Sequence, residues 1–305
     1  MYYPILKAKR HELNSLYDLS SRLNAAKYRP VIEPVNRSFV EVFDAVEELH
    51  KHSVQPLVVI NPSQGFFSSA TSANVFSQLQ SNTKSANRFT PCIKVRDSSD
   101  SISLSLLSMY PGAAVYLEND ALMSSVALLN TASLVILNQQ KVDSDVVDKL
   151  SKVVLYADNF AKKKRNADYG ASSFYSNLHV SYKKRKNAVG FGDFTIMAEE
   201  YSESGGPAYV VAIHASHIDA LLPNSIQVRH FLSTTGGTLP TNPGGKYLEA
   251  LDKLINFDAI NPGFFDSTLG MGEFKASHAV GHYPGLGIVK EMSIKHHIES
   301  VCNFI

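Results

Sequence analysis

The stretch "YRPVIEPV" (residues 28–35) has the form of a short buried strand, with apolar residues between a proline and a carboxylate, Glu33. In three other stretches a proline is likewise followed by apolar residues and then by a polar one, namely "YYPILKAK" (2–9), "VQPLVVINP" (54–62) and "FTPCIKVRD" (89–97). Strands that are apolar throughout are typical of parallel sheets, whose two faces are both covered. The repeated form therefore favours a buried parallel sheet.

Strands of this kind alternate with amphipathic helices along the first two thirds of the chain. Further strands are expected at "AAVYLEND" (113–120), "SLVILNQ" (133–139), "KVVLYADNF" (152–160) and "NAVGFGDFTI" (187–196). The intervening helices are expected at 10–26, 38–52, 72–80, 101–110, 121–130 and 143–152. This alternation predicts a parallel sheet with right-handed crossovers. Eight units in about 200 residues match a small (β/α)8 TIM-like barrel, and an open doubly wound sheet is the alternative.

Each of the eight predicted strands ends in a polar residue that lies two positions after an apolar one, so the two side chains share a face of the strand. The polar residues are Lys7, Glu33, Asn61, Lys94, Glu118, Asn138, Asp158 and Asp193. If the apolar partners fill a barrel, these side chains line its mouth at the carboxyl ends of the strands, where barrel active sites lie. The alternative is a structural ring of ion pairs, in which Lys7 joins Glu33 and Lys94 joins Glu118.

The pattern changes at about residue 199. Two strand-like stretches, "GGPAYVVAIHASHI" (205–218) and "SIQVRHFLSTTGG" (225–237), are close enough in sequence to form a hairpin. "GGKYLEALDKLINF" (244–257) is expected to be a covering helix of the barrel. We therefore predict a single barrel domain over residues 1–305, with a hairpin insertion at 199–240 and closing helices after it.

Composition places the chain among globular proteins, because 44% of its residues are hydrophobic and 19% are charged. The net charge of +1 gives no overall attraction to nucleic acid or to membranes, so such binding would need local patches. No apolar run reaches the length of a membrane span, and the amino-terminal residues lack the layout of a signal peptide. Cys92 and Cys302 are expected to be reduced thiols in a cytoplasmic protein.

Two basic segments flank a tyrosine-containing stretch, "KKKR" at Lys162–Arg165 and "KKRK" at Lys183–Lys186. Basic residues interleaved with aromatic ones can hold phosphates and stack bases, so these segments are candidates for nucleic-acid binding. A solvated loop is the alternative interpretation. Zinc binding by histidines is disfavoured, because His214 and His217 would point to opposite faces of a strand.

Several motifs resemble, in order, the beta-protein-like family of phage and bacterial proteins. They are "MYYPILKAKRHEL", "RPVIEPV", "INPSQG", "GFGDFTI", "IHASHI", "VRHF", "KYLEAL" and "HHIE". The resemblance implies a setting in mobile elements or antiviral defence and a nuclease-like protein partner, with no settled reaction. Its motifs point, without roles, at Lys7, Lys9, Glu33, Asp193, Arg229 and His230.

Two functions remain open at this stage. In the first, the barrel is an enzyme that binds and hydrolyses a phosphorylated or nucleotide-like ligand. Its acid/base or Mg²⁺-binding groups would be Glu33 and Asp158, with Lys7 and Lys94 holding phosphate. The further catalytic candidates are Glu118 and Asp193, and the substrate-binding candidates are Lys9, Asn61, Asn138, Arg229 and His230. In the second, the barrel is a non-catalytic subunit that binds nucleic acid or a protein and works with a neighbouring nuclease.

Overall fold

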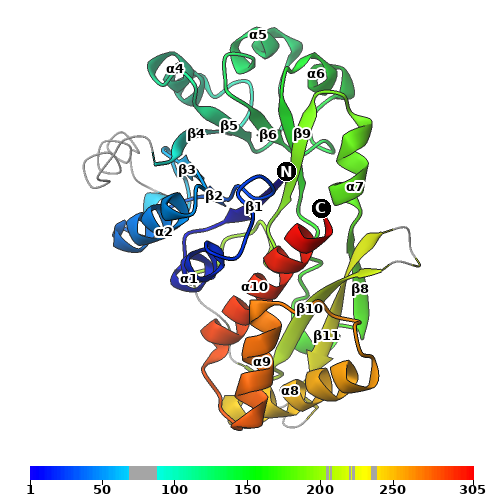
Figure 1. Cartoon of the computed structure of the whole chain (residues 1–305). Coiled ribbons are helices and arrows are strands. Elements are labelled where there is room, and N and C mark those ends of the chain that lie inside the picture. Colours follow the sequence, from blue (N-terminus) through cyan, green and yellow to red (C-terminus); the bar gives the residue numbers. More distant parts are fainter. Residues whose placement is uncertain (69–87, 204–205, 207, 220, 222–223, 235–238) are drawn as a thin grey trace. The chain divides into compact units, whose positions relative to one another are not determined.

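The computed structural model (Figure 1) describes the chain except for residues 69–87, 204–205, 207, 220, 222–223 and 235–238. The described residues divide into two compact units. Unit 1 comprises Met1–Asp158 and Leu178–Phe194, and unit 2 comprises Asn159–Asn177 and Thr195–Ile305. Each unit is described by itself, and the single barrel domain expected over residues 1–305 stays a prediction.

Unit 1 is a closed barrel of parallel strands, as predicted, in the order β1-β2-β3-β4-β5-β6-β7-β9. The strands are β1 (Tyr2–Leu6), β2 (Val31–Ile32), β3 (Leu57–Val59), β4 (Thr90–Val95), β5 (Ala114–Leu117), β6 (Val135–Leu137), β7 (Val153–Ala157) and β9 (Ala188–Asp193). Parallel pairing of β9 with both β7 and β1 closes the ring. The chain therefore has the (β/α)8 TIM-like fold, and the open sheet is excluded.

Helices follow the strands and surround them, as Figure 1 shows. They are α1 (Arg10–Leu19), α2 (Val40–Lys51), α4 (Ser101–Met109), α5 (Val126–Leu129), α6 (Ser144–Lys149) and α7 (Leu178–Ser181). Short 3₁₀ turns occur at η1 (Gly65–Ser68), η3 (Met123–Ser125) and η5 (Tyr182–Lys184). The helix expected at 72–80 lies outside the described residues.

The barrel is filled by side chains at alternating positions of its strands. The buried cluster contains Tyr3, Ile5, Val31, Leu57, Val59, Cys92, Ala114, Tyr116, Leu134, Ile136, Val154, Tyr156 and Phe194. The cluster includes the apolar residues that the strand pattern predicted to point inward on β1 to β7, namely Ile5, Val31, Val59, Cys92, Tyr116, Ile136 and Tyr156. Cys92 and Cys302 are both buried and form no disulfide, as expected.

In the last barrel strand, β9, the residues that face inward are the ones we expected to face outward. A Cβ atom on Gly190 would collide with the Tyr3 ring, and one on Gly192 would collide with the Tyr3 backbone. The glycines of β9 therefore face the interior, where the Tyr3 ring takes the space of their missing side chains. Phe191 consequently lies on the outer face, where its ring stacks on Tyr2 at 5.2 Å between centroids.

Unit 2 is built on an antiparallel sheet of order β10-β11-β8. Its strands are β10 (Ala212–Asp219), β11 (Ser225–Leu232) and β8 (Ser172–Ser176), and a 3₁₀ turn, η4 (Asn166–Asp168), precedes β8. The expected hairpin is confirmed by β10 and β11, which pair from Ala212 with Leu232 to Asp219 with Ser225. The strand β8 was not expected, since "SSFYS" is polar and lies in the long loop before the last barrel strand.

Three helices complete unit 2, namely α8 (Pro243–Ile260), α9 (Leu269–Ala279) and α10 (Leu286–Phe304). Their apolar side chains form a separate core with the sheet, centred on residues such as Ile213, Tyr247, Leu251 and Phe274. The helix that we expected to cover the barrel is α8, and it packs on β10 and β11. Residues after 199 therefore build a core of their own in addition to the hairpin.

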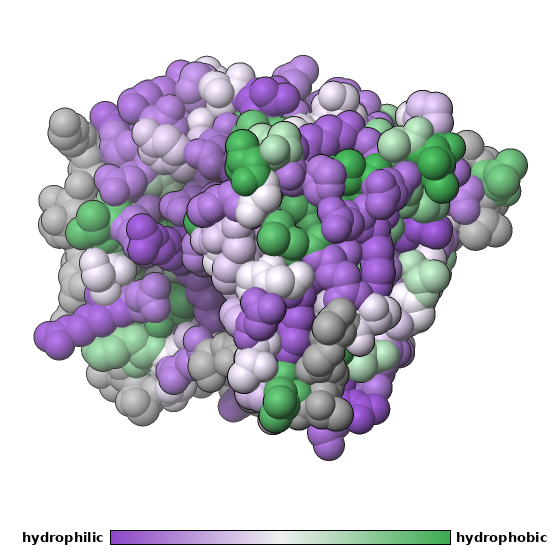
Figure 2. All heavy atoms as spheres, turned by 90° about the horizontal axis from the view of Figure 1, so that it is seen from below, coloured by the Kyte–Doolittle hydropathy of each residue, from purple (hydrophilic) through white to green (hydrophobic). Residues whose placement is uncertain are grey.

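The face drawn in Figure 2 is mostly hydrophilic, with groups of hydrophobic residues among the hydrophilic ones. Among the described residues, no helix combines the length and the apolar character that a membrane crossing needs.

Close packing of α9 on α10 generates a prediction for Gly270. A Cβ atom there would collide with the Met292 carbonyl oxygen of α10, whereas a Cβ atom on Gly272, also in α9, would meet nothing within 4 Å. We expect Gly270→Ala to lower the free energy of unfolding by about 1–3 kcal/mol because it overpacks the interface. Gly272→Ala should raise it by about 0.5–1 kcal/mol, since alanine favours helix.

Urea denaturation of the two variants measures this difference. Equal effects of the two substitutions would contradict the proposed packing of the two helices.

Candidate functional site

The mouth of the barrel holds a continuous chain of ion pairs between four of the predicted side chains. Glu33 lies between two lysines, with its Oε2 atom 2.9 Å from Lys7 Nζ and its Oε1 atom 2.8 Å from Lys94 Nζ. Lys94 Nζ also lies 2.8 Å from Glu118 Oε1. Lys7, Glu33, Lys94 and Glu118 thus join β1, β2, β4 and β5, as the alternative of an ion-pair ring predicted.

Strand alternation and aromatic packing position these groups. Lys7, Glu33 and Lys94 each follow an inward apolar residue by two positions, so they continue the interior row at the carboxyl ends of their strands. The Lys7 ammonium lies 5.5 Å from the centre of the Phe194 ring, and the Lys94 ammonium lies 5.9 Å from that of Tyr116. Aromatic rings beneath the two ammonium groups favour their positive charge.

The electrostatics of the mouth keep Glu33 and Lys94 ionised. Burial by itself raises the pKa of Glu33, which is 1% exposed, but attraction to Lys7 and Lys94 outweighs burial and holds the pKa below its ordinary value. Burial likewise lowers the pKa of Lys94, but the carboxylates of Glu33 and Glu118 outweigh it and raise the pKa. Both shifts oppose proton transfer near neutral pH, because an acid/base catalyst needs a pKa close to the working pH.

The two asparagines of the predicted ring form hydrogen bonds with backbone groups. Asn61 forms a pair of hydrogen bonds with the backbone of Lys94, donating to its carbonyl oxygen at 2.7 Å and accepting from its N–H at 2.7 Å. Its Nδ2 atom also donates a hydrogen bond to the hydroxyl oxygen of Ser103 in α4, at 3.1 Å. Asn138 accepts a hydrogen bond from the N–H of Gln140 at 2.9 Å, which closes a turn.

Of the two predicted aspartates, Asp193 departs from expectation, whereas Asp158 keeps the expected phase. Asp193 lies on the outer face of β9, where its Oδ1 atom accepts a hydrogen bond from the Tyr2 hydroxyl at 2.7 Å. Our expectation that it lines the mouth was wrong, because the glycines of β9 occupy the inward positions. Asp158 follows Tyr156 in the inward phase, and its side chain is exposed.

The remaining predicted binding residues make contacts of other kinds. Lys9 precedes α1, where its carbonyl oxygen accepts hydrogen bonds from the N–H groups of Glu12 and Leu13. Arg229 and His230 belong to unit 2 and, as consecutive residues of β11, point to opposite faces. The Arg229 guanidinium lies 3.8 Å from the centre of the Phe257 ring.

The two basic segments differ in how far their charge is neutralised. In 162–165, Lys162 pairs with Glu200 and Arg165 pairs with Asp168. In 183–186, Arg185 pairs with Asp148. Within the described chain, Lys184 and Lys186 form no ion pair. Both line a cleft of about 580 Å³, whose other lining residues are Ser144, Asp148, Arg185 and Asn187.

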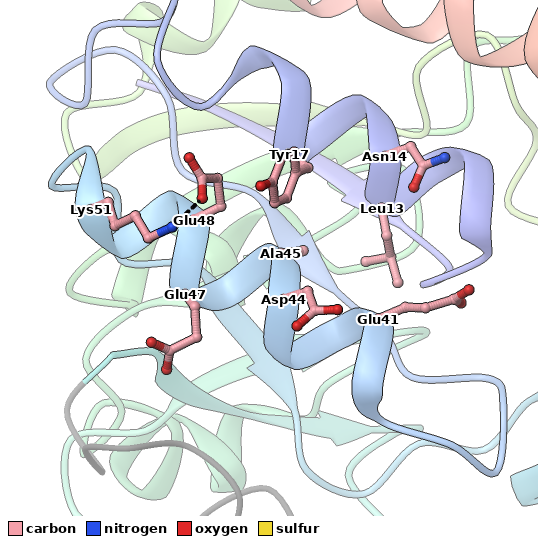
Figure 3. Close-up of a pocket in the computed structure, with 9 residues that line it drawn as sticks. All are labelled: Leu13, Asn14, Tyr17, Glu41, Asp44, Ala45, Glu47, Glu48 and Lys51. Atoms are coloured by element: carbon pink, nitrogen blue, oxygen red, sulfur yellow. Dashed lines mark hydrogen bonds and ion pairs between the residues drawn. The ribbon is translucent and has the colours of Figure 1, made fainter.

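A second cleft, of about 450 Å³, lies between α1 and α2 and was not anticipated (Figure 3). Its lining is rich in carboxylates, namely Glu41, Asp44, Glu47 and Glu48. Figure 3 shows these side chains spreading in different directions, so they do not converge on one cation. Glu48 is engaged with Lys51 at 2.6 Å.

Metal binding finds no support in the described part of the chain, where no three histidine, cysteine, aspartate or glutamate residues are grouped to hold an ion. His214 contacts Phe160 and Tyr169, whereas His217 contacts Phe264. The two histidines therefore point to opposite faces of β10, as the sequence predicted.

Comparisons with known proteins found no match: no family model fits the sequence, and neither curated proteins nor solved structures gave a significant similarity. The resemblance inferred from the motifs therefore stays a prediction.

The central position of Glu33 predicts a large loss of stability on its removal. Glu33→Ala leaves two ammonium groups buried without their shared partner, and we expect the free energy of unfolding to fall by about 3–5 kcal/mol. The matched control is Glu48→Ala, which removes a surface pair with the exposed Lys51 and should leave stability almost unchanged. Denaturant unfolding of both variants measures this.

The loss should also depend on pH in a defined direction. The pKa of Glu33 in the folded protein lies below its ordinary value of 4.5. The contribution of the ionised carboxylate to the free energy of unfolding is therefore complete above pH 4.5, and it is lost as the pH falls through the folded-state pKa. The difference between wild type and Glu33→Ala should therefore shrink in acid. A difference that grows in acid would show that the carboxylate is not stabilised in its charged form.

Proposed function

We propose that the chain is a TIM-barrel binding subunit that holds the phosphate backbone of nucleic acid and leaves cleavage to a nuclease-like partner. The observation that carries this proposal is the basic cleft of unit 1, where Lys184 and Lys186 have no carboxylate partner in the described chain. A phage, mobile-element or antiviral-defence setting and the nuclease-like partner rest on the family resemblance alone.

The chemistry of the cleft suits a phosphate chain. Lysine and arginine side chains bind phosphates by charge and release condensed counterions, whatever the base sequence. Lys183 is exposed beside the cleft and lies 6.0 Å from the centre of the Tyr182 ring. Segment 183–186 is a stronger candidate than 162–165, since in the latter two of the four cations are already paired with carboxylates.

The location of the cleft also supports binding over catalysis. Segment 183–186 precedes β9 and therefore lies at the amino end of that strand. Barrel enzymes place their reacting groups at the opposite, carboxyl ends of the strands. A non-catalytic role for this surface needs no acid, base or nucleophile in the cleft.

A phosphorylated or nucleotide-like ligand at the barrel mouth is less well supported. Such a ligand would have to compete with Glu33 for both the Lys7 and the Lys94 ammonium groups. Mg²⁺ does not fit these residues either, because each oxygen of Glu33 already accepts a hydrogen bond from a lysine. Hydrolysis at the mouth is therefore not part of the proposal.

We place this activity in the cytoplasm. Buried, free thiols at Cys92 and Cys302 are consistent with a reducing compartment.

Charge removal in the cleft tests the proposal. We expect the triple variant Lys183→Gln, Lys184→Gln, Lys186→Gln to bind fluorescein-labelled 20-mer duplex DNA at least about tenfold more weakly at low salt. The slope of log Kd against log salt should also fall by about 2–3, because each lost phosphate contact removes roughly 0.9. Fluorescence anisotropy at several salt concentrations measures both quantities.

Lys51→Gln is the matched control, since Lys51 is an exposed lysine of the same unit that pairs with Glu48. It should bind DNA as the wild type does. Equal affinity and equal salt dependence of the triple variant and the wild type would refute the proposal.

A further inference from the structure

Three side chains from different strands meet on one face of the sheet in unit 2. His214 of β10 pairs directly with His230 of β11, and Val228 of β11 pairs with Ser173 of β8. Residues paired across strands share a face, and so do residues two apart along a strand. Ser173, His230 and His214 therefore lie side by side on this face, although they come from segments far apart in the sequence.

A line of hydrogen bonds connects the three residues. Ser173 Oγ lies 2.9 Å from His230 Nε2, and His230 Nδ1 lies 2.7 Å from His214 Nδ1. One proton lies between the two Nδ1 atoms. When His230 carries it, the Nε2 lone pair of His230 accepts the hydrogen bond of the serine hydroxyl. This is the arrangement of nucleophile, base and orienting group found in serine hydrolases, with a histidine in the third position.

Aromatic packing holds the two imidazoles in place. The Tyr169 ring lies 4.6 Å from His230 and 4.8 Å from His214, and Phe160 lies 5.1 Å from His214, between ring centres. A nucleophile and base need this kind of rigid support to stay within reach of each other.

The environment keeps both imidazoles neutral and able to accept a proton. Burial, assisted by His230 and Lys290, lowers the pKa of His214 to about 3. Burial, assisted by Lys163, lowers the pKa of His230 to about 4. A base of low pKa removes a proton weakly, so the expected substrates carry a good leaving group.

Ser173 is accessible enough to react. It is half-buried on β8, which is the outer strand of the sheet β10-β11-β8, and its neighbours Ser172 and Phe174 are exposed. A small electrophile can therefore approach from the strand edge without displacing the core of unit 2.

We propose that Ser173, His230 and His214 form a nucleophilic centre that cleaves activated carboxylic esters. Ser173 Oγ attacks the ester carbonyl carbon while its proton passes to His230 Nε2. The bond to the leaving alcohol then breaks, and that alcohol takes the proton from His230. Water attacks the acyl-serine next, giving one proton through His230 back to Ser173 Oγ and releasing the carboxylic acid. His214 acts through its hydrogen bond to His230 and is a positioning residue.

A fluorophosphonate probe tests this centre in the full-length chain. The serine forms an Oγ–P bond, fluoride leaves, and the proton passes through His230 to solvent. We expect mass mapping to find the adduct on Ser173, and the labelling to disappear in Ser173→Ala. Ser172→Ala, which removes the exposed neighbouring hydroxyl, should be labelled like the wild type. Absence of an adduct on Ser173 in the wild type overturns the proposal.

The histidines provide the second part of the test. His230→Gln should slow labelling about 100-fold or more, the usual contribution of a general base. His214→Asn retains an oxygen that can accept the His230 Nδ1 proton and should react faster than His214→Leu. Labelling of Ser173 at the same rate in His230→Gln would overturn the assignment, because the serine would then react without its base.

Discussion

The attraction between one buried carboxylate and two ammonium groups governs the mouth of the barrel. A buried ion is costly unless its partners are close and its hydrogen bonds are satisfied. Glu33 meets both conditions through Lys7 and Lys94, and Lys94 extends the pairing to Glu118. The pairing links the carboxyl ends of four strands and balances these charges against one another within the barrel mouth.

This pairing separates the scaffold from the surfaces that remain available for function. Unit 1 carries uncompensated positive charge at the amino end of β9, in the cleft of Lys184 and Lys186. Unit 2 carries neutral histidines in hydrogen-bond contact with a serine on an outer strand. Neither feature belongs to the ring of charged residues that the sequence predicts at the carboxyl ends of the barrel strands.

Much of unit 1 could be predicted from the sequence, because inward residues recur with a period of two and polar residues follow in phase. The pattern places Asp193 wrongly, because it favours the bulky Phe191 as the inward residue of β9, whereas the Tyr3 ring fills the space beside Gly190. Strand β8 and Ser173 escaped prediction for another reason. The polar stretch "SSFYS" becomes a strand only by pairing with β11, about fifty residues later, and local patterns do not encode such pairing.

The protonation of Glu33 is the most direct measure of the central claim. Carboxyl ¹³C NMR of the labelled protein, with the Glu33 signal assigned by its loss in Glu33→Gln, follows the titration of this one side chain. Pairing with two lysines predicts a midpoint below the ordinary value of 4.5. A midpoint raised toward neutral pH would contradict the account, because it would mark Glu33 as a desolvated acid poised for proton transfer.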